Sequence, residues 1–141
     1  DVFTMKKMMN KKGFTLMEML IVVAIIAILV AIAIPTFSGT LKKANAATDL
    51  ANIRSGYASA QITAMTENHS TDATYYLQKD GTVKSDATGR DDYVCKAGST
   101  DAGTFDKIGG RLDAEWTQGD KITYKIVKNT NTVESIASPE N

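Results

Sequence analysis

The longest hydrophobic segment of the chain runs from Phe14 to Ile34 and contains a single charged residue, Glu18. Its 21 residues would form a helix about 32 Å long, close to the roughly 30 Å hydrocarbon core of a bilayer. Pro35 follows this segment directly. The pattern predicts a helix that either spans a membrane or is buried among other apolar elements.

Beyond Pro35 the hydrophobic positions become one-sided. Apolar residues recur three or four positions apart and predict one buried stripe on a helix, made of Leu50, Ile53, Tyr57, Ala60 and Ala64. Polar residues are expected off this stripe: Lys42, Lys43, Asp49, Asn52, Arg54 and Gln61. Because a proline with helical periodicity on both sides can kink a helix without ending it, we predict one helix over residues 15–65, about 75 Å long, with a kink near Pro35.

The C-terminal part of the chain shows the alternation expected of a short antiparallel strand pair. Apolar residues alternate with polar ones over residues 121–128, and residues 132–137 are expected to return beside them after a turn at 129–131. Trp116 is expected to anchor the core near this pair.

Residues 67–92 are rich in polar residues and glycine, and predict a connecting loop. Within this loop Asp80-Gly81 is a hairpin turn signal between residues 74–78 and 82–85. A further short strand is expected at residues 93–96. The chain is therefore predicted to be α+β, with a small antiparallel sheet packed on the second half of the long helix.

The chain divides by pattern into three segments. Residues 1–13 form a leader, residues 14–38 the membrane or filament-core half of the helix, and residues 39–141 a globular head. Residues 1–4 precede the first methionine and are expected to be a cloning remnant or an overcalled start.

Charge is distributed unevenly along a chain whose formal net charge is zero. The leader carries four lysines and a net charge of +3, which should keep it in the cytoplasm and the head outside. The remaining residues carry a net charge of −3 without a basic run, so nucleic-acid binding is not expected from composition.

A cleaved secretory signal peptide is the main alternative for the N-terminal segment. It would use the same lysines and a cleavage site at Ala31-Ile32-Ala33. The uncharged run from Met19 to Ala33 already reaches the upper limit of about 15 residues for such a peptide. Glu18 also falls within the extended apolar run, where a signal peptide gains nothing from a charge.

Candidates for enzyme or metal chemistry are few. His69, the only histidine, is expected to be solvated in its loop, and Cys95, the only cysteine, to be a half-buried strand residue that cannot form an internal disulfide. Four loop residues miss the spacing of a calcium loop and are interpreted as solvated: Asp86, Gly89, Asp91 and Asp92. Asn68-His69-Ser70 matches the short glycosylation pattern. No catalytic residue, metal site or cofactor is predicted.

Glu18 needs an explanation, because an acid at the centre of a membrane helix costs about 2.5–3.5 kcal/mol. One explanation is a carboxylate that snorkels towards the nearby helix end. The other is a cation partner. Cleavage between Gly13 and Phe14 would create an ammonium group four residues away, and at about 4 Å and an effective dielectric near 20 the two charges would attract by about 4 kcal/mol. An ammonium group of a neighbouring chain would also set the axial register between subunits.

The segment Lys12-Gly13-Phe14-Thr15-Leu16-Met17-Glu18, with its apolar run and Pro35, resembles the class III signal of type IV pilins over about residues 5–40. The resemblance implies that prepilin peptidase cuts after Gly13 and that Phe14 becomes an N-methylated terminus. It also implies that Glu18 docks on the ammonium group of an adjacent subunit and that the helix loosens before Pro35. Cys95 alone cannot close the C-terminal disulfide of many pilins, which suggests stabilisation by strand pairing.

The resemblance implies a structural subunit of a bacterial filament, not an enzyme. A single-pass precursor in the inner membrane would pass through an assembly platform into a homo-oligomeric surface pilus for motility, adhesion or DNA uptake, with no specific nucleic-acid partner evident. A pseudopilin of a type II secretion or competence system shares every motif used here. A membrane-anchored binding domain or enzyme that never assembles is the alternative from another class.

Overall fold

The computed structural model describes residues 15–85, 87–103, 107–110 and 114–139. The chain divides into two compact units, one up to Gly39 and one from Thr40 onward.

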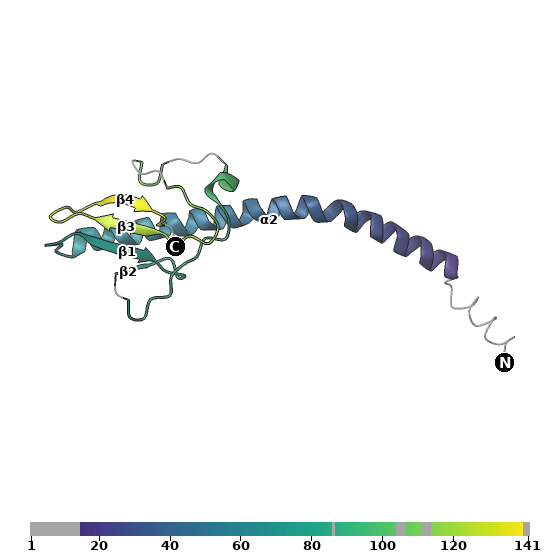
Figure 1. Cartoon of the computed structure of the whole chain (residues 1–141), viewed down its shortest axis with the longest axis horizontal. Helices are drawn as coiled ribbons and strands as arrows, with labels where there is room; N and C mark the ends of the chain where they lie inside the picture. Colours follow the sequence, from purple (N-terminus) through teal and green to yellow (C-terminus); the bar gives the residue numbers. More distant parts are fainter. Residues whose placement is uncertain (1–14, 86, 104–106, 111–113, 140–141) are drawn as a thin grey trace. The chain divides into compact units, whose positions relative to one another are not determined.

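One long helix, α2 (Leu16–Thr66), runs through both units (Figure 1). Its bounds confirm the helix predicted over residues 15–65. Pro35 lies inside it, and the kink predicted there stays a prediction. In the last turn the backbone N–H of Glu67 donates to the carbonyl of Thr63 at 3.0 Å and satisfies one of the terminal carbonyls of the helix.

The second unit contains a four-stranded antiparallel sheet in the order β2-β1-β3-β4 (Figure 1). The strands are β1 (Ala73–Leu77), β2 (Val83–Lys84), β3 (Thr123–Ile126) and β4 (Val133–Ala137). Both predicted hairpins are confirmed, and so is the α+β class. Asp80 closes the first hairpin by accepting the backbone N–H of Thr82 at 3.0 Å.

The strand predicted at residues 93–96 is wrong. Only two isolated bridges form there, Gln78 with Asp92 and Val94 with Lys121. The reason is that the N–H groups that would extend the ladder are taken elsewhere. Those of Lys96 and Ala97 donate to the side chain of Asp49.

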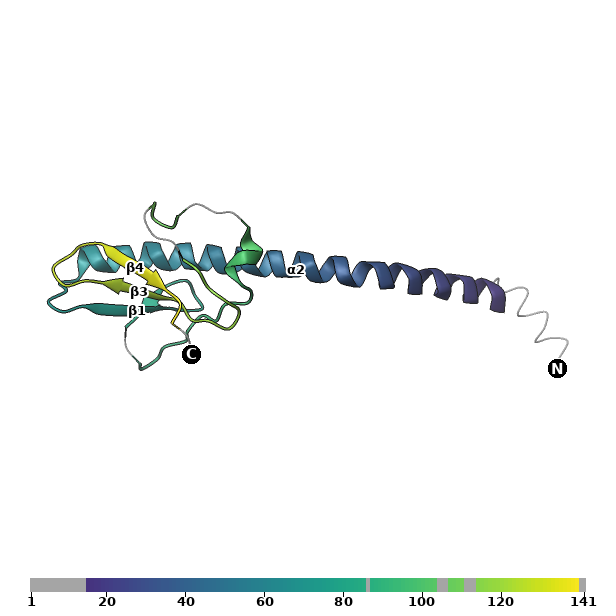
Figure 2. The ribbon, with the colours of Figure 1, turned by 45° about the horizontal axis from the view of Figure 1, so that its top comes forward.

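The core of the second unit lies between α2 and one face of the sheet (Figure 2). Ile53, Ala60 and Ala64 are fully buried, as predicted, and Trp116 is also buried. The stripe also contains Gly56 and Asp49, both buried on the sheet side of α2. Placing Asp49 off the stripe was wrong, because its carboxylate faces a cluster of donors inside the head.

Candidate functional site

The candidate site lies at the start of α2, at the point predicted for cleavage and assembly. Gly13 and Phe14 fall outside the described residues, so the cleavage and N-methylation predicted for them stay predictions. The described chain begins at Thr15, directly before the first helical residue, Leu16.

Thr15 and Glu18 hold the N-terminus of α2 through two reciprocal hydrogen bonds. The backbone N–H of Thr15 donates to Oε2 of Glu18 at 2.9 Å, and the backbone N–H of Glu18 donates to Oγ1 of Thr15 at 3.3 Å. This arrangement is a capping box, which satisfies N–H groups that have no acceptor within the helix. The carboxylate also lies in the first turn, where the helix dipole favours negative charge.

Glu18 therefore has a partner in its own helix while the leader is still attached. Neither of the two explanations offered for Glu18, snorkelling and pairing with an ammonium group, includes this contact with Thr15. Thr15 is therefore the residue of the site that the sequence analysis missed. The signal was present, because Thr-x-x-Glu ahead of an apolar run is the signature of a capping box. Docking of Glu18 on the terminus of another subunit stays a prediction.

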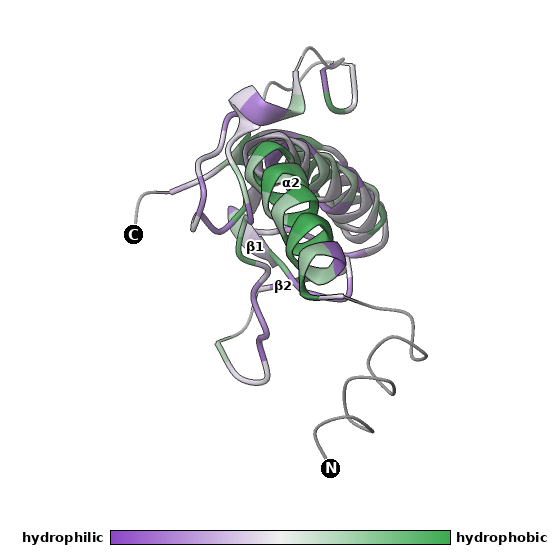
Figure 3. Cartoon of the chain, turned by 90° about the vertical axis from the view of Figure 1, so that its right-hand side faces the viewer, coloured by the Kyte–Doolittle hydropathy of each residue, from purple (hydrophilic) through white to green (hydrophobic). Residues whose placement is uncertain are grey.

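The helix beyond this cap exposes an apolar surface on all sides. Every large hydrophobic side chain within residues 16–37 is exposed, from 46% at Val22 to 81% at Leu16. Figure 3 shows the hydrophobic colouring along this part of α2. The mean hydropathy of this segment reaches 3.0, and by length and composition the helix can cross a membrane.

Pro35 interrupts the hydrogen-bond ladder within this apolar helix. Proline has no N–H, so it cannot donate to the carbonyl of Ala31 four residues earlier. The hydroxyl of Thr36 donates to the carbonyl of Ile32 at 3.4 Å.

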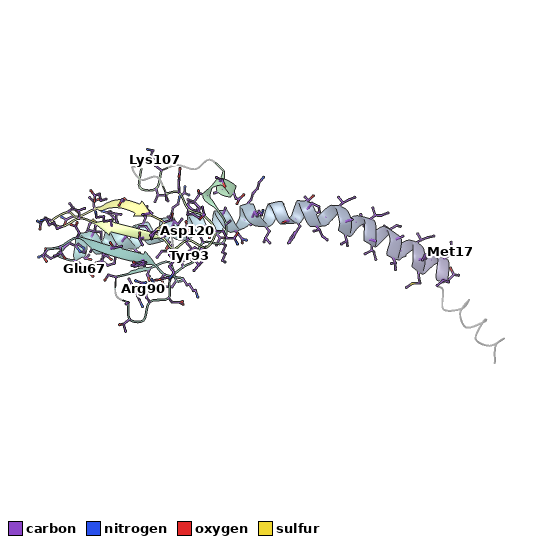
Figure 4. The ribbon with its side chains drawn as sticks, in the orientation of Figure 1. Met17, Glu67, Arg90, Tyr93, Lys107 and Asp120 are labelled. Carbon is purple, nitrogen blue, oxygen red and sulfur yellow. The ribbon has the colours of Figure 1, made fainter. Side chains whose placement is uncertain are left out.

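Asp49, unlike the exposed Glu18, is a buried carboxylate, and it connects the helix to the loops of the head. Its Oδ1 accepts the hydroxyl of Tyr93 and the backbone N–H of Lys96, the latter at 2.9 Å. Its Oδ2 accepts the backbone N–H of Ala97 at 2.9 Å and Nε1 of Trp116 at 3.3 Å. One helical side chain thus binds two loops that lie 44 to 67 residues further along the chain. Tyr93 is labelled in Figure 4.

Cys95 lies beside this cluster and is more buried than predicted. It keeps 2% of its exposure and belongs to a loop, not to a strand. Burial, together with the charges of Asp49 and Asp120, raises the pKa of the Cys95 thiol to about 12. Its thiolate population near neutral pH is therefore negligible, which argues for a structural role.

The expectation that His69 is solvated was wrong. The side chain is 8% exposed and meets the ring of Tyr75 edge-on, with ring centroids 6.0 Å apart. Its Nε2 lies 3.4 Å from the carbonyl of Thr63 in the last turn of α2, so the imidazole helps to close the helix. Among the residues that the structure describes, no cluster of three histidine, cysteine, aspartate or glutamate side chains could hold a metal ion.

The interpretation of the loop after β2 as fully solvated was wrong for Asp92. Its side chain is 9% exposed and pairs with Nε of Arg90 at 2.9 Å and with Nζ of Lys121 at 3.4 Å. Asp91 and Gly89 are exposed, whereas Asp86 lies outside the described residues. The loop is therefore tied to the sheet by ion pairs.

Comparison with known proteins gives matches that begin at the N-terminal motif. Residues 8–34 match the family model described as the prokaryotic N-terminal methylation motif. The chain is 49% identical to the type IV narrow pilus major component PilA5 of Thermus thermophilus over an aligned stretch of 59 residues. This stretch makes up 40% of this chain and 51% of PilA5. The chain is also 60% identical to the type IV wide pilus major component PilA4 of the same organism over 38 residues. That stretch makes up 27% of this chain and 29% of PilA4. No solved structure gives a significant match.

The chain thus spans about half the length of PilA5 and less than a third of PilA4. A methylation motif that leads into an exposed apolar helix fits a membrane-anchored precursor that becomes part of a surface pilus. The motif and the two pilin relatives support a type IV pilin.

Proposed function

We propose that this chain is a structural subunit of a type IV pilus, cut between Gly13 and Phe14 by a prepilin peptidase and then assembled with copies of itself into a helical surface filament. The observation that carries the proposal is the apolar surface of α2 over residues 16–37. In the part of the chain that the structure describes, no side chain of this segment is buried.

Such a surface cannot remain in water. Fifteen large hydrophobic residues are exposed on it, and each contributes about 1.5–3 kcal/mol when transferred out of water. The total is on the order of tens of kcal/mol, more than the stability of a typical domain. A bilayer can cover the segment before assembly, and the same segment of neighbouring copies can cover it in a filament.

The capping box suggests how Glu18 functions in both environments. In the precursor the N–H of Thr15 partly compensates the carboxylate. In a bundle of helices, a terminal ammonium group supplied by Phe14 of a neighbouring copy would add an attraction of about 4 kcal/mol at an effective dielectric near 20. Because such a pair forms at one axial offset, it would define the register of the filament.

The names of the two relatives support a major subunit over a pseudopilin. Both are described as major components of type IV pili. Motility, adhesion or DNA uptake would then be properties of the assembled filament.

Cleavage is tested by mass spectrometry of the N-terminus of the protein from its native cells. We expect a mature chain that begins at methylated Phe14. A chain that begins at Ile34 would support ordinary secretion, and a chain that keeps Lys12 and Gly13 would contradict processing.

Assembly is tested with two substitutions at Glu18 that separate charge from capping. Glutamine at this position keeps an acceptor for the N–H of Thr15 but carries no charge, whereas alanine removes both. If the ammonium pair drives assembly, Glu18→Gln and Glu18→Ala both abolish filaments while the precursor stays in the membrane. Normal filament yield from Glu18→Gln would show that the cap suffices and that the charge pair is not required.

A further inference from the structure

A hollow of about 590 Å³ lies on the head, beside the start of β4. Four segments supply its polar wall: Tyr57 from α2, Gly109 from a loop, Thr130 and Thr132 from the hairpin between β3 and β4, and Glu134 from β4 itself. The volume falls within the range of about 300–1,000 Å³ that is usual for ligand sites. None of these residues belongs to the capping box or to the exposed apolar segment.

The walls of the hollow are fixed to one another by hydrogen bonds. Gln61 of α2 donates from Nε2 to the carbonyl of Asn131 at 3.0 Å, and its Oε1 accepts the backbone N–H of Val133 at 3.0 Å. The hydroxyl of Thr130 closes the hairpin turn by donating to the carbonyl of Val127 at 2.6 Å. A ligand would therefore meet a site that is largely formed before it binds, which lowers the cost of binding.

Gly109 allows its loop to lie directly against the ring of Tyr57. A Cβ atom at Gly109 would overlap Cζ of Tyr57, and the φ of 68° at this position also favours glycine. Lys107, labelled in Figure 4, belongs to the same loop. The phenol ring is thereby held at the edge of the hollow. Among the described residues its hydroxyl has no hydrogen-bond partner, so it can donate to a ligand.

A β-bulge sets the position of Glu134 at this hollow. Lys125 pairs with Ser135 and Ile126 pairs with Val133, so Glu134 has no partner on β3. Bulges change the direction of side chains and are frequent beside functional sites. Glu134 is exposed and forms no ion pair within the described part of the chain. Both of its carboxylate oxygens can therefore accept hydrogen bonds from a ligand.

The groups around the hollow fit a neutral saccharide better than an ion. A sugar ring carries hydroxyl groups at its edge and C–H groups on its faces, so it needs polar partners next to apolar carbon. The hydroxyl of Tyr57 and the carboxylate of Glu134 are such partners, and Val127 and Val133 supply the apolar part. The carboxylate disfavours an anion. A cation is disfavoured by Lys125, which brings a positive charge to the neighbouring strand beside the bulge.

We propose that this hollow binds neutral hexose units of a polysaccharide. The hydroxyl of Tyr57 and the carboxylate of Glu134 hold hydroxyl groups of the sugar, while Val127 and Val133 contact its C–H face. The site lies within the head, so binding to a single chain does not require assembly. In a filament, which rests on the proposed function, the site would be repeated on every subunit and weak contacts would add up along one polysaccharide.

The test measures binding of methyl glycosides of glucose, galactose and mannose to the full chain by saturation-transfer NMR, in a detergent whose headgroup is not a sugar. Tyr57→Phe combined with Glu134→Gln removes the hydroxyl and the charge at the hollow but keeps the shapes of both side chains. Tyr76→Phe combined with Glu115→Gln makes the same chemical changes at residues outside the hollow. We expect at least one glycoside to bind, and the first pair to weaken its binding at least about fivefold, as expected for the loss of two hydrogen bonds. The control pair should change the affinity less than about twofold. Glu134→Gln alone, a change at an exposed residue, should also weaken binding if the pair proves unstable.

Three results would overturn the proposal. Failure of the unmodified chain to bind any of the three glycosides would exclude this class of ligand. Equal weakening by both pairs would mean that sugars bind outside the hollow. Preference for ethanolamine, a small ammonium compound, over the glycosides would show that Glu134 binds a cation. Electron microscopy of the native protein reports separately whether filaments form, so a failure of assembly is distinguished from a failure of sugar binding.

Discussion

At the scale of single residues, Asp49 fixes loops of the head to the helix, a role that disulfide bonds have in many small extracellular domains. Cys95 has no cysteine partner in the chain, so the loops around Tyr93 and Trp116 are fixed to α2 by hydrogen bonds to one carboxylate. Hydrogen bonds to a charged acceptor contribute about 1.5–3 kcal/mol each, more than those between neutral groups. Burial also raises the pKa of Tyr93, so its hydroxyl remains a donor.

Substituting Asp49→Asn should destabilise the head by about 2–4 kcal/mol. The amide NH2 group would replace one oxygen and face donors, which leaves at least one buried N–H without an acceptor, at about 1–3 kcal/mol for each such group. Urea unfolding followed by the fluorescence of Trp116, the only tryptophan, measures the change directly. Glu134→Gln, a change at an exposed residue, should leave the unfolding midpoint unaltered. Equal stability of both variants would contradict the role given to Asp49.

The ionised carboxylate of Asp92 should stabilise the head at neutral pH, and this contribution should be lost in acid. Burial alone would raise the pKa of Asp92, but hydrogen bonds from Gln78 and Lys121 and the charge of Arg90 hold it below its ordinary value. Its contribution is therefore fully present above the unfolded pKa of about 3.9 and is lost as the pH falls through the lower folded value. Unfolding midpoints between about pH 6 and pH 2 should fall less steeply for Asp92→Asn than for the unmodified chain. Parallel curves would show that Asp92 is not linked to the acid transition.

At the scale of elements, the contact between α2 and the sheet depends on a glycine. A Cβ atom at Gly56 would overlap the hydroxyl of Tyr124 and lie 2.5 Å from Cδ1 of Leu77. That hydroxyl is fixed by its bond to the carbonyl of Ile53. A second close contact lies nearby, where the hydroxyl of Ser55 donates to the carbonyl of Gly81 at 3.1 Å. At Gly56 the helix therefore packs closely against Leu77 of β1 and Tyr124 of β3 because no side chain lies between them.

Gly56→Ala should destabilise the head by about 1–3 kcal/mol, because overpacking at the helix–sheet contact outweighs the gain of about 1 kcal/mol in helix propensity. Gly39→Ala is the matched control in the same helix, since no atom outside the helix backbone lies within 4 Å of the position that its Cβ would take. That control should leave the thermal unfolding of the head unchanged or slightly raise it. Similar unfolding temperatures for both variants would mean that the close contact at Gly56 relaxes without cost.

The elements and the two hairpins were predictable because their patterns are local, whereas contacts between side chains far apart in the sequence were not. Helical periodicity revealed α2, and alternation revealed β3. The burial of Asp49 could not be predicted, because its donors lie in loops without periodicity, 44 or more residues away. The same holds for the ion pair of Asp92 with Lys121, whose two residues lie in separate segments of the chain. The capping box was a local signal, and Thr15 could have been identified from its spacing to Glu18.

At the scale of the whole molecule, hydrophobic surface and hydrophobic core are separated along the chain. The buried residues of the described chain begin at Ala46, and residues 15–44 are all exposed. The core of the head, from Ile53 to Ile136, is contained in the unit that starts at Thr40. The exposed apolar residues of the helix therefore contribute nothing to the core of the head, and the head should be stable without them.

A fragment that starts at Thr40 should accordingly fold without detergent and remain soluble. Its core includes Trp116 together with side chains of β1, β3 and β4, so the Trp116 emission and the unfolding midpoint should match those of the full chain in detergent. Circular dichroism, tryptophan fluorescence and size-exclusion chromatography measure these properties, and the full chain without detergent should aggregate through residues 16–37. An unfolded fragment would show that the head needs the apolar helix to fold. A fragment that assembles into filaments would contradict the assignment of assembly to the apolar segment and Glu18.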